Sequence, residues 1–81
     1  KRYDFETYEI PLGSIFTFTR NPNVTCKLVE GSNVEFNSEV MSLSKAAQMA
    51  LGVNWPTQGP IYWEYDEETL DERRRRYEQE V

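Results

Sequence analysis

The sequence predicts one small α+β domain, in which a mostly antiparallel β-meander of four to five strands packs one alanine-rich helix and a charged C-terminal helix follows. Short β-branched and aromatic runs alternate with turn residues over 15–41. An apolar stripe at helical spacing occupies 43–51. The 81 residues suffice for one domain, which we divide into a body, 1–65, and a charged C-terminal helix, 66–81.

The first part of the chain is expected to form a β-hairpin preceded by an arm. Residues 1–9 mix aromatic and acidic side chains, which predicts an edge strand or an ordered arm. Residues 15–20 and 24–29 are predicted strands, joined by turn residues at 21–23. Because side chains alternate along a strand, one face of the second strand is expected to hold Val24, Cys26 and Leu28.

Three more short strands are predicted. Residues 34–36 and 40–41 follow turns at 30–33 and 37–39 and continue the meander. Residues 61–65 form the last predicted strand, after a loop that contains Pro and Gly. Alternation along this strand places on one face Ile61, Trp63 and Tyr65.

The first helix is predicted from its caps and its apolar stripe. Ser42 is the expected N-cap, and Gly52 is the expected C-terminal stop. The three alanines of the stripe allow the helix to approach a sheet closely. The stripe itself consists of Leu43, Ala46, Ala47, Ala50 and Leu51.

The C-terminal helix is predicted from its charges. Thr69 and Glu72 have the spacing of a capping box, and Asp66 is a rival cap. Two acid-first pairs at i,i+4, each worth ~0.2–0.5 kcal/mol, are Asp71–Arg75 and Glu72–Arg76. A thin heptad-like seam consists of Leu70, Arg74, Tyr77 and Val81. Because so thin a seam cannot hold a helix alone, it must dock on the body, pair with another helix or continue into further sequence.

Composition disfavours catalysis and metal binding. The chain has no histidine and one cysteine, Cys26, so it has neither a cysteine zinc site nor an intramolecular disulfide, and no histidine to activate the thiol. No Gly-rich phosphate loop is present. We therefore expect a non-catalytic chain that uses no cofactor and no metal.

The charge distribution bears on the choice of partner. The net charge of -5 disfavours nonspecific attraction to nucleic acid or to an anionic membrane. Residues 1–65 hold five cations and seven anions, whereas residues 66–81 hold four cations and seven anions. No apolar run approaches the ~18 residues that span a membrane. The chain starts with Lys1 and shows no signal peptide, so we expect a cytoplasmic piece of a longer protein.

The start of the predicted helix is one candidate binding site. Ser42, Ser44 and Lys45 lie there. Free backbone N–H groups, two hydroxyls and the helix dipole are suited to a phosphate, and Lys45 adds charge. The alternative, which we favour, is that Ser42 is an ordinary cap and Ser44 an exposed residue of the first turn.

Aromatic residues form a second candidate group, namely Trp55, Tyr62 and Trp63. They are suited to stacking on a base, including a flipped or modified one. The alternative is core packing, which we favour for Trp63 because of strand alternation. Trp55 precedes a proline in a loop and is the better candidate for an exposed ring.

Basic residues occur at two further places. Arg20 and Lys27 flank the first predicted hairpin turn, together with two asparagines, and are candidates for phosphate contacts. Solvated turn positions are the favoured alternative. The run Arg73–Arg76 lies in a segment of sixteen residues, 66–81, that also contains seven acidic residues. A solvated helix face is therefore favoured over a nucleic-acid contact.

Two segments resemble the motifs of a known family. Residues 41–47, MSLSKAA, and 59–63, GPIYW, are similar to the helix and strand motifs of the RAMA domain, named for restriction-system-associated modification recognition, and of its relatives of unassigned function. The resemblance covers roughly residues 10–65. Here Gln58 and Pro60 flank the glycine where the family commonly has Asn-Gly, and the acidic tail lies outside the pattern. The matching residues are Ser42, Leu43, Ser44, Ala46, Ala47, Gly59, Tyr62 and Trp63.

The resemblance implies an accessory reading module within a larger restriction or nuclease-type protein. Members of the family are proposed to recognise modified DNA. For this chain it implies stacking by Trp55 or Tyr62 and phosphate capture by the segment from Ser42 to Lys45. The alternative is a protein-interaction or oligomerisation module, motivated by the negative charge and by the seam on the C-terminal helix.

Overall fold

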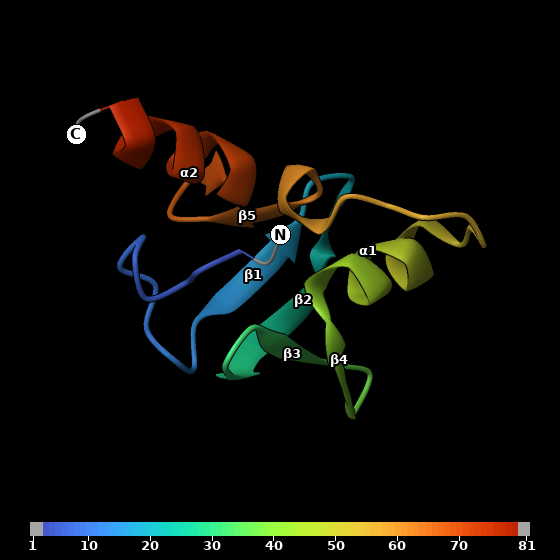
Figure 1. Ribbon diagram of the computed structural model, residues 1–81. Helices are drawn as coiled ribbons and strands as arrows, with labels where there is room; N and C mark the ends of the chain where they lie inside the picture. The colour runs from blue at the N-terminus through green and yellow to red at the C-terminus, as the bar shows by residue number, and fades with distance from the viewer. Residues whose placement is uncertain (1–2, 80–81) are drawn as a thin grey trace.

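The computed structural model describes residues 3–79 and confirms the α+β class. Six strands form one antiparallel sheet in the order β4-β3-β2-β1-β5-β6. The strands are β1 (Ile15–Phe18), β2 (Asn21–Glu30), β3 (Asn33–Phe36), β4 (Glu39–Ser42), β5 (Trp63–Tyr65) and β6 (Glu68–Thr69). The helices are α1 (Leu43–Leu51), the 3-10 helix η1 (Gly59–Ile61) and α2 (Leu70–Gln79). Figure 1 shows α1 and α2 on opposite sides of the molecule.

The sixth strand arises from a tight turn that the sequence analysis assigned to the C-terminal helix. Asp66 and Glu67 have φ values of 56° and 69°, and Tyr65 pairs with Glu68 across them. Two consecutive residues with positive φ are typical of the two-residue turns that match the twist of a hairpin. Asp66 is therefore a turn residue, and the rival cap expected there is not used.

The first hairpin turns earlier than predicted. Its turn lies at Thr19 and Arg20, and β2 already begins at Asn21, which pairs with Phe18. The register between β1 and β2 is irregular from Thr17 to Phe18. Pro22 cannot donate a backbone hydrogen bond, and an irregular strand end is where a sheet tolerates it.

The segment 61–65 is not one continuous strand. Pro60 lies in η1, and the strand begins only at Trp63. Ile61 was predicted to share the face of Trp63, but it is 42% exposed, so that prediction is wrong. The fixed φ of proline and its missing N–H favour the helical turn over the ladder. Trp63 is fully buried, as the core interpretation expected.

The N-terminal segment is an ordered arm, which is one of the two expected alternatives. Residues 3–12, here called the arm, contain turns and no strand. Phe5, Tyr8 and Ile10 are buried in the core. The Phe5 ring stacks on that of Phe16 with centroids 5.6 Å apart. The arm therefore completes the core from outside the sheet.

Helix α1 closes another part of the core and has the predicted caps. The Ser42 hydroxyl accepts a hydrogen bond from the Lys45 backbone N–H at 3.1 Å. Gly52 ends the helix in the left-handed conformation with φ 75°. Leu43 and the first two alanines of the stripe are buried, and α1 contacts β3, β4 and η1.

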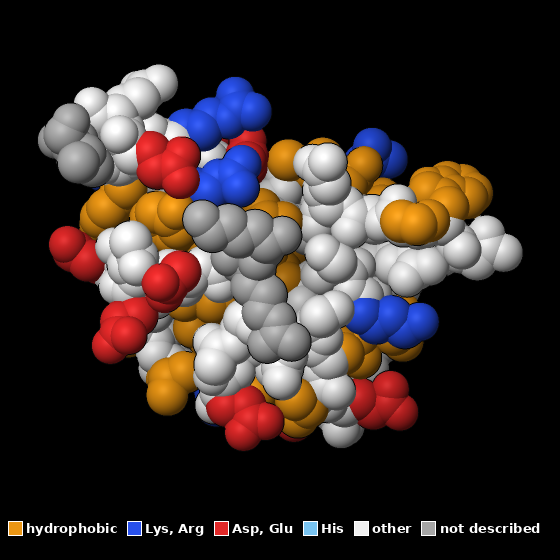
Figure 2. Space-filling view, in the orientation of Figure 1, with side chains coloured by type: hydrophobic (Ala, Val, Ile, Leu, Met, Phe, Trp, Pro, Cys, Tyr) orange, Lys and Arg blue, Asp and Glu red, His pale blue; other side chains and the backbone are white. Residues whose placement is uncertain are grey.

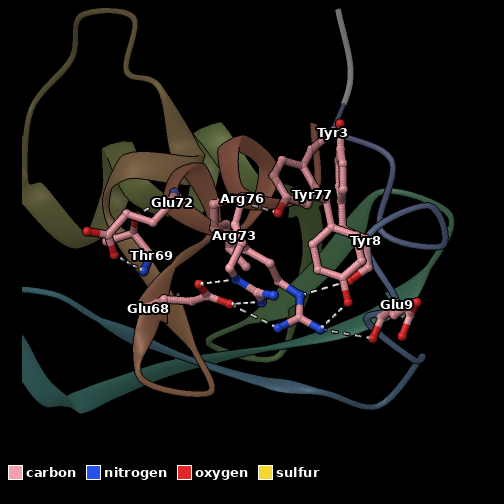
Figure 3. Close-up of polar contacts among 10 residues, drawn as sticks. Tyr3, Tyr8, Glu9, Glu68, Thr69, Glu72, Arg73, Arg76 and Tyr77 are labelled. Carbon is pink, nitrogen blue, oxygen red and sulfur yellow. Dashed lines mark hydrogen bonds and ion pairs between the residues drawn. The ribbon is translucent and has the colours of Figure 1, made fainter. Parts of the chain in front are cut away.

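Helix α2 docks on the arm through Arg73, as Figure 3 shows. The Arg73 guanidinium donates to the carbonyl of Tyr8 at 2.8 Å and to that of Glu9 at 3.4 Å. It also pairs with Glu68 at 3.1 Å. Its carbon Cζ lies 5.2 Å from the ring centroids of Tyr65 and Tyr77, which is within cation–π range.

The burial of Arg73 corrects the expected role of the arginine run. The Arg73 side chain is 8% exposed, whereas that of Arg75 is 70% exposed. Arg74 and Arg75 pair with Asp71, and Arg76 pairs with Glu68. The run is thus a solvated face except at its first member.

The seam residues Leu70 and Tyr77 of α2 pack against the body, and the capping box begins the helix. Leu70 is fully buried, and the Tyr3 hydroxyl donates to its carbonyl at 2.7 Å. Thr69 and Glu72 form the predicted capping box, with hydrogen bonds of 2.8 and 3.0 Å. Tyr77 packs against the core. Val81, the last seam residue, lies outside the described residues.

Within residues 3–79, no helix combines the length and the apolar character that crossing a membrane requires.

We expect Arg73→Ala to lower the free energy of unfolding by about 3 kcal/mol, since it removes the donor to the Tyr8 and Glu9 carbonyls and one of the two arginines that pair with Glu68. Urea unfolding followed by tryptophan fluorescence measures the change. Arg75→Ala is the matched control, because Arg75 is 70% exposed and should cost less than about 1 kcal/mol. Equal losses for the two variants would contradict the docking role of Arg73.

We also expect stability to fall in acid through Glu68. Hydrogen bonding and charge from Arg76, with a smaller effect of Arg73, hold the pKa of Glu68 below its usual 4.5. A carboxylate whose pKa is lower in the folded state than in the unfolded state stabilises the fold at pH values above the unfolded-state pKa. This stabilisation is lost as the pH falls through the folded-state pKa. Glu68→Gln should therefore flatten the dependence of the urea unfolding free energy on pH below 4.5. An unchanged slope in the Glu68→Gln protein would contradict this role of Glu68.

Candidate functional site

The two motif segments of the sequence meet in the structure. The backbone N–H of Gly59 donates to the Ser44 hydroxyl at 3.2 Å, which joins η1 to the start of α1. A Cβ atom at Gly59 would lie 2.9 Å from the Leu43 carbonyl carbon and 2.9 Å from the Ser44 nitrogen. Only glycine permits this approach, because two of the atoms it meets are backbone atoms.

The serines at the start of α1 have structural partners. Ser42 caps the helix, and Ser44 holds Gly59. The favoured interpretation is confirmed for both serines, since Ser42 is the N-cap and Ser44 is exposed in the first turn. The contact of Ser44 with Gly59 is an additional tertiary role that spacing did not predict. Lys45 is exposed beside them and is the charged group at this helix end.

A second contact joins the first hairpin to η1. The Thr19 N–H donates to the Tyr62 carbonyl at 2.9 Å. The Tyr62 ring stacks on Phe18, with centroids 6.3 Å apart and an interplanar angle of 30°. Arg20 lies over the Tyr62 ring with its Cζ 5.5 Å from the centroid. The structure thereby brings together two predicted site residues, Arg20 and Tyr62, that are distant in sequence.

The two tryptophans have opposite environments. Trp55 is 61% exposed in the loop after α1, where the Thr57 hydroxyl donates to its carbonyl at 3.1 Å. Trp63 is fully buried against Phe18 and Phe36, with ring centroids 5.3 and 6.0 Å away. Its indole N–H has no hydrogen-bond partner among the described residues. Trp63 therefore supports the site from the core and offers no ring face to a ligand, which corrects its candidacy as a stacking residue.

We call Arg20, Lys45, Trp55 and Tyr62 the loop surface. Neither Arg20 nor Lys45 forms an ion pair with any residue from 3 to 79. The arginines of α2, in contrast, are paired with carboxylates. In Figure 2, hydrophobic and basic side chains are exposed at the right, over α1 and the loop, and further basic side chains lie beside acidic ones at the upper left, over α2. Acidic side chains follow the left and lower edges of this view.

Sequence reasoning missed two features of the structure. Ile61 is exposed beside Tyr62, and the proline before it was the signal for a break in the strand. Hollows along the arm, which involve Tyr3 and Phe5, depend on contacts that no local pattern encodes.

Two chemical features of the described residues bear on the candidate site. Among residues 3–79 no group of three or more His, Cys, Asp and Glu side chains is arranged to hold a metal ion. Burial raises the pKa of Cys26 to about 12, so its sulfur is a protonated thiol at neutral pH and a poor nucleophile. The loop surface offers the exposed ring of Trp55 and the positive charges of Arg20 and Lys45.

No protein-family model matches the chain, and no curated protein matches it.

We expect Gly59→Ala to destabilise the protein by about 1–3 kcal/mol, because the added methyl group meets backbone atoms of α1 that cannot yield cheaply. Thermal unfolding followed by circular dichroism measures the loss. Gln58→Ala, at the exposed neighbouring position, should stay within about 0.5 kcal/mol of the unchanged protein. A Gly59→Ala protein as stable as the Gln58→Ala protein would show that α1 and η1 are not held in close contact.

Proposed function

We propose that the chain is a non-catalytic recognition module that binds duplex DNA through the loop surface. The observation that carries the proposal is the presence of two cations without ion pairs among the described residues, Arg20 and Lys45, together with the exposed ring of Trp55 and the half-buried ring of Tyr62. Positive charge binds phosphates, and an exposed ring stacks on an accessible base.

The resemblance to the RAMA domain supports the modified-DNA version of this proposal. The two motif segments that carry the resemblance are the start of α1 and η1 with the start of β5, which meet at Gly59. Their meeting gives the motifs a shared structural purpose, which is to hold Lys45 beside the segment that carries Tyr62. In this proposal the module serves a larger cytoplasmic restriction or nuclease-type protein.

The charges also set the expected strength of binding. With a net charge of -5, long-range repulsion opposes DNA, and the loop surface supplies few phosphate contacts. Binding should therefore be weak at physiological salt and tighten as salt is lowered. A parent protein that contributes its own DNA contacts would compensate.

The alternative of self-association through α2 finds less support. Leu70 and Tyr77, which motivated it, pack against the core of the same chain. The exposed face of α2 carries ion-paired side chains, such as Arg75 with Asp71, and these contribute little to an interface.

Fluorescence anisotropy with labelled duplexes, plain or carrying N6-methyladenine or 5-methylcytosine, tests the proposal at two salt concentrations. We expect binding to depend on salt, and Trp55→Ala to weaken it by about 1–3 kcal/mol. Lys45→Glu should reduce the slope of log K against log salt concentration by about one or more. Preference for a modified duplex would identify the base class that the module reads.

The control is Lys27→Glu, which makes the same charge change at an exposed position. Lys27 alternates with the buried Cys26 and Leu28, so it points away from the side of the sheet that α1 covers. If Lys45→Glu and Lys27→Glu weakened binding equally, the change in net charge alone would explain the loss. That result would contradict the proposal that DNA binds at the loop surface. Absence of binding to every duplex at low salt would overturn the DNA proposal.

A further inference from the structure

A groove runs beside the arm on a part of the molecule that the loop surface does not use. Its larger part has a volume of about 770 Å³ and lies between the arm and the β2–β3 turn at Gly31 and Ser32. A smaller hollow of about 350 Å³ adjoins it and reaches the start of α1. The two parts share three lining residues, Tyr3, Phe5 and Ser32, so they form one elongated depression, the arm groove.

The larger part of the arm groove is apolar inside and acidic at its edge. Phe5, Ile10 and Leu28, all at most 4% exposed, contribute to its lining, and Leu12 stands 66% exposed beside them. An exposed leucine next to a hollow is apolar surface that a partner can bury. This end therefore suits an apolar side chain.

Two carboxylates, Asp4 and Glu6, line this end, and none of the described lining residues is Lys or Arg. Hydrogen bonds from the Thr7 hydroxyl, at 2.6 Å, and from its backbone N–H hold the pKa of Asp4 below its usual value. Asp4 is thus ionised at neutral pH. The negative charge repels nucleic acid and attracts basic groups.

The smaller part is lined by neutral polar groups. Ser32, Asn33 and Ser44 contribute a hydroxyl or an amide to it. An extended peptide has backbone N–H and C=O groups that need partners when they leave water. Hydroxyl and amide groups beside an apolar hollow supply such partners without selecting for charge.

We propose that the arm groove is a docking site for an extended segment of a partner protein in which an apolar residue alternates with Lys or Arg. The apolar residue enters the hollow beside Leu12, the basic residues face Asp4 and Glu6, and the backbone continues past Ser32. The arm groove shares no residue with the loop surface, and the two come nearest at the start of α1, where Ser42 and Ser44 line the smaller part of the groove next to Lys45. The chain would then hold a protein on one side while the loop surface contacts DNA.

NMR titration of the 15N-labelled 81-residue chain tests the proposal with three capped pentapeptides. One alternates lysine with leucine, the second alternates glutamate with leucine, and the third alternates lysine with glycine. We expect only the lysine–leucine peptide to shift the amides of residues 4–6, 12 and 31–33. Equal shifts with the glutamate–leucine or lysine–glycine peptide would overturn the proposal, as would no shifts in the arm groove with any peptide.

Matched variants separate the arm groove from general attraction to an acidic protein. Glu6→Gln should weaken the lysine–leucine peptide about two- to fivefold, as expected for one exposed ion pair. Glu35→Gln makes the same change on the far face of the sheet and should leave the affinity unchanged. Leu12→Asn should weaken binding, and Val40→Asn, at a residue 57% exposed on the edge strand β4, should not. Equal losses of affinity for the two glutamate variants, or for Leu12→Asn and Val40→Asn, would contradict binding of the peptide in the arm groove.

Discussion

The buried guanidinium of Arg73 joins segments that local interactions cannot bring together. A planar group with five donors satisfies two carbonyls of the arm and the carboxylate of Glu68, while two tyrosine rings cover its faces. Each partner would be costly to bury alone. Arg73 therefore connects the arm, the β5–β6 hairpin and α2 at one point, and the bond from the Tyr3 hydroxyl to the Leu70 carbonyl adds a second link between the arm and α2. The wall that the arm contributes to the groove depends on these links indirectly.

A second constraint, the close approach at Gly59, positions the other side of the molecule. The 3-10 helix η1 contacts both α1 and α2, so it links the two constraints through the body. Tyr62 at the end of η1 is held between Phe18 and Arg20, while Trp55 projects from the preceding loop. The result is a positive, aromatic surface on one side and an acidic, apolar groove along the arm.

Local patterns in the sequence predicted the elements whose formation is local. The α1 caps and the capping box at Thr69 agree with the structure because their partners lie within a few residues. The strand boundaries near Pro22 and Pro60 differed, because an irregular register and a 3-10 turn accommodated the prolines. Charge patterning assigned Arg73 to solvent, since its partners on the arm are more than sixty residues away. The individual residues of the candidate site were predicted from the sequence. Which of them lie close together depends on the tertiary fold and was not predicted.

Native-state hydrogen exchange on the unmodified protein tests most directly whether Arg73 makes the arm and α2 one cooperative unit. The Ile10 amide, which donates to the Phe5 carbonyl at 2.9 Å, reports on the arm, and amides in the second turn of α2 report on the helix. The account predicts that both open with the same free energy and the same dependence on denaturant. If α2 opened at a clearly lower free energy while Ile10 stayed protected, the helix would be an independent appendage, and the central role of Arg73 would be wrong.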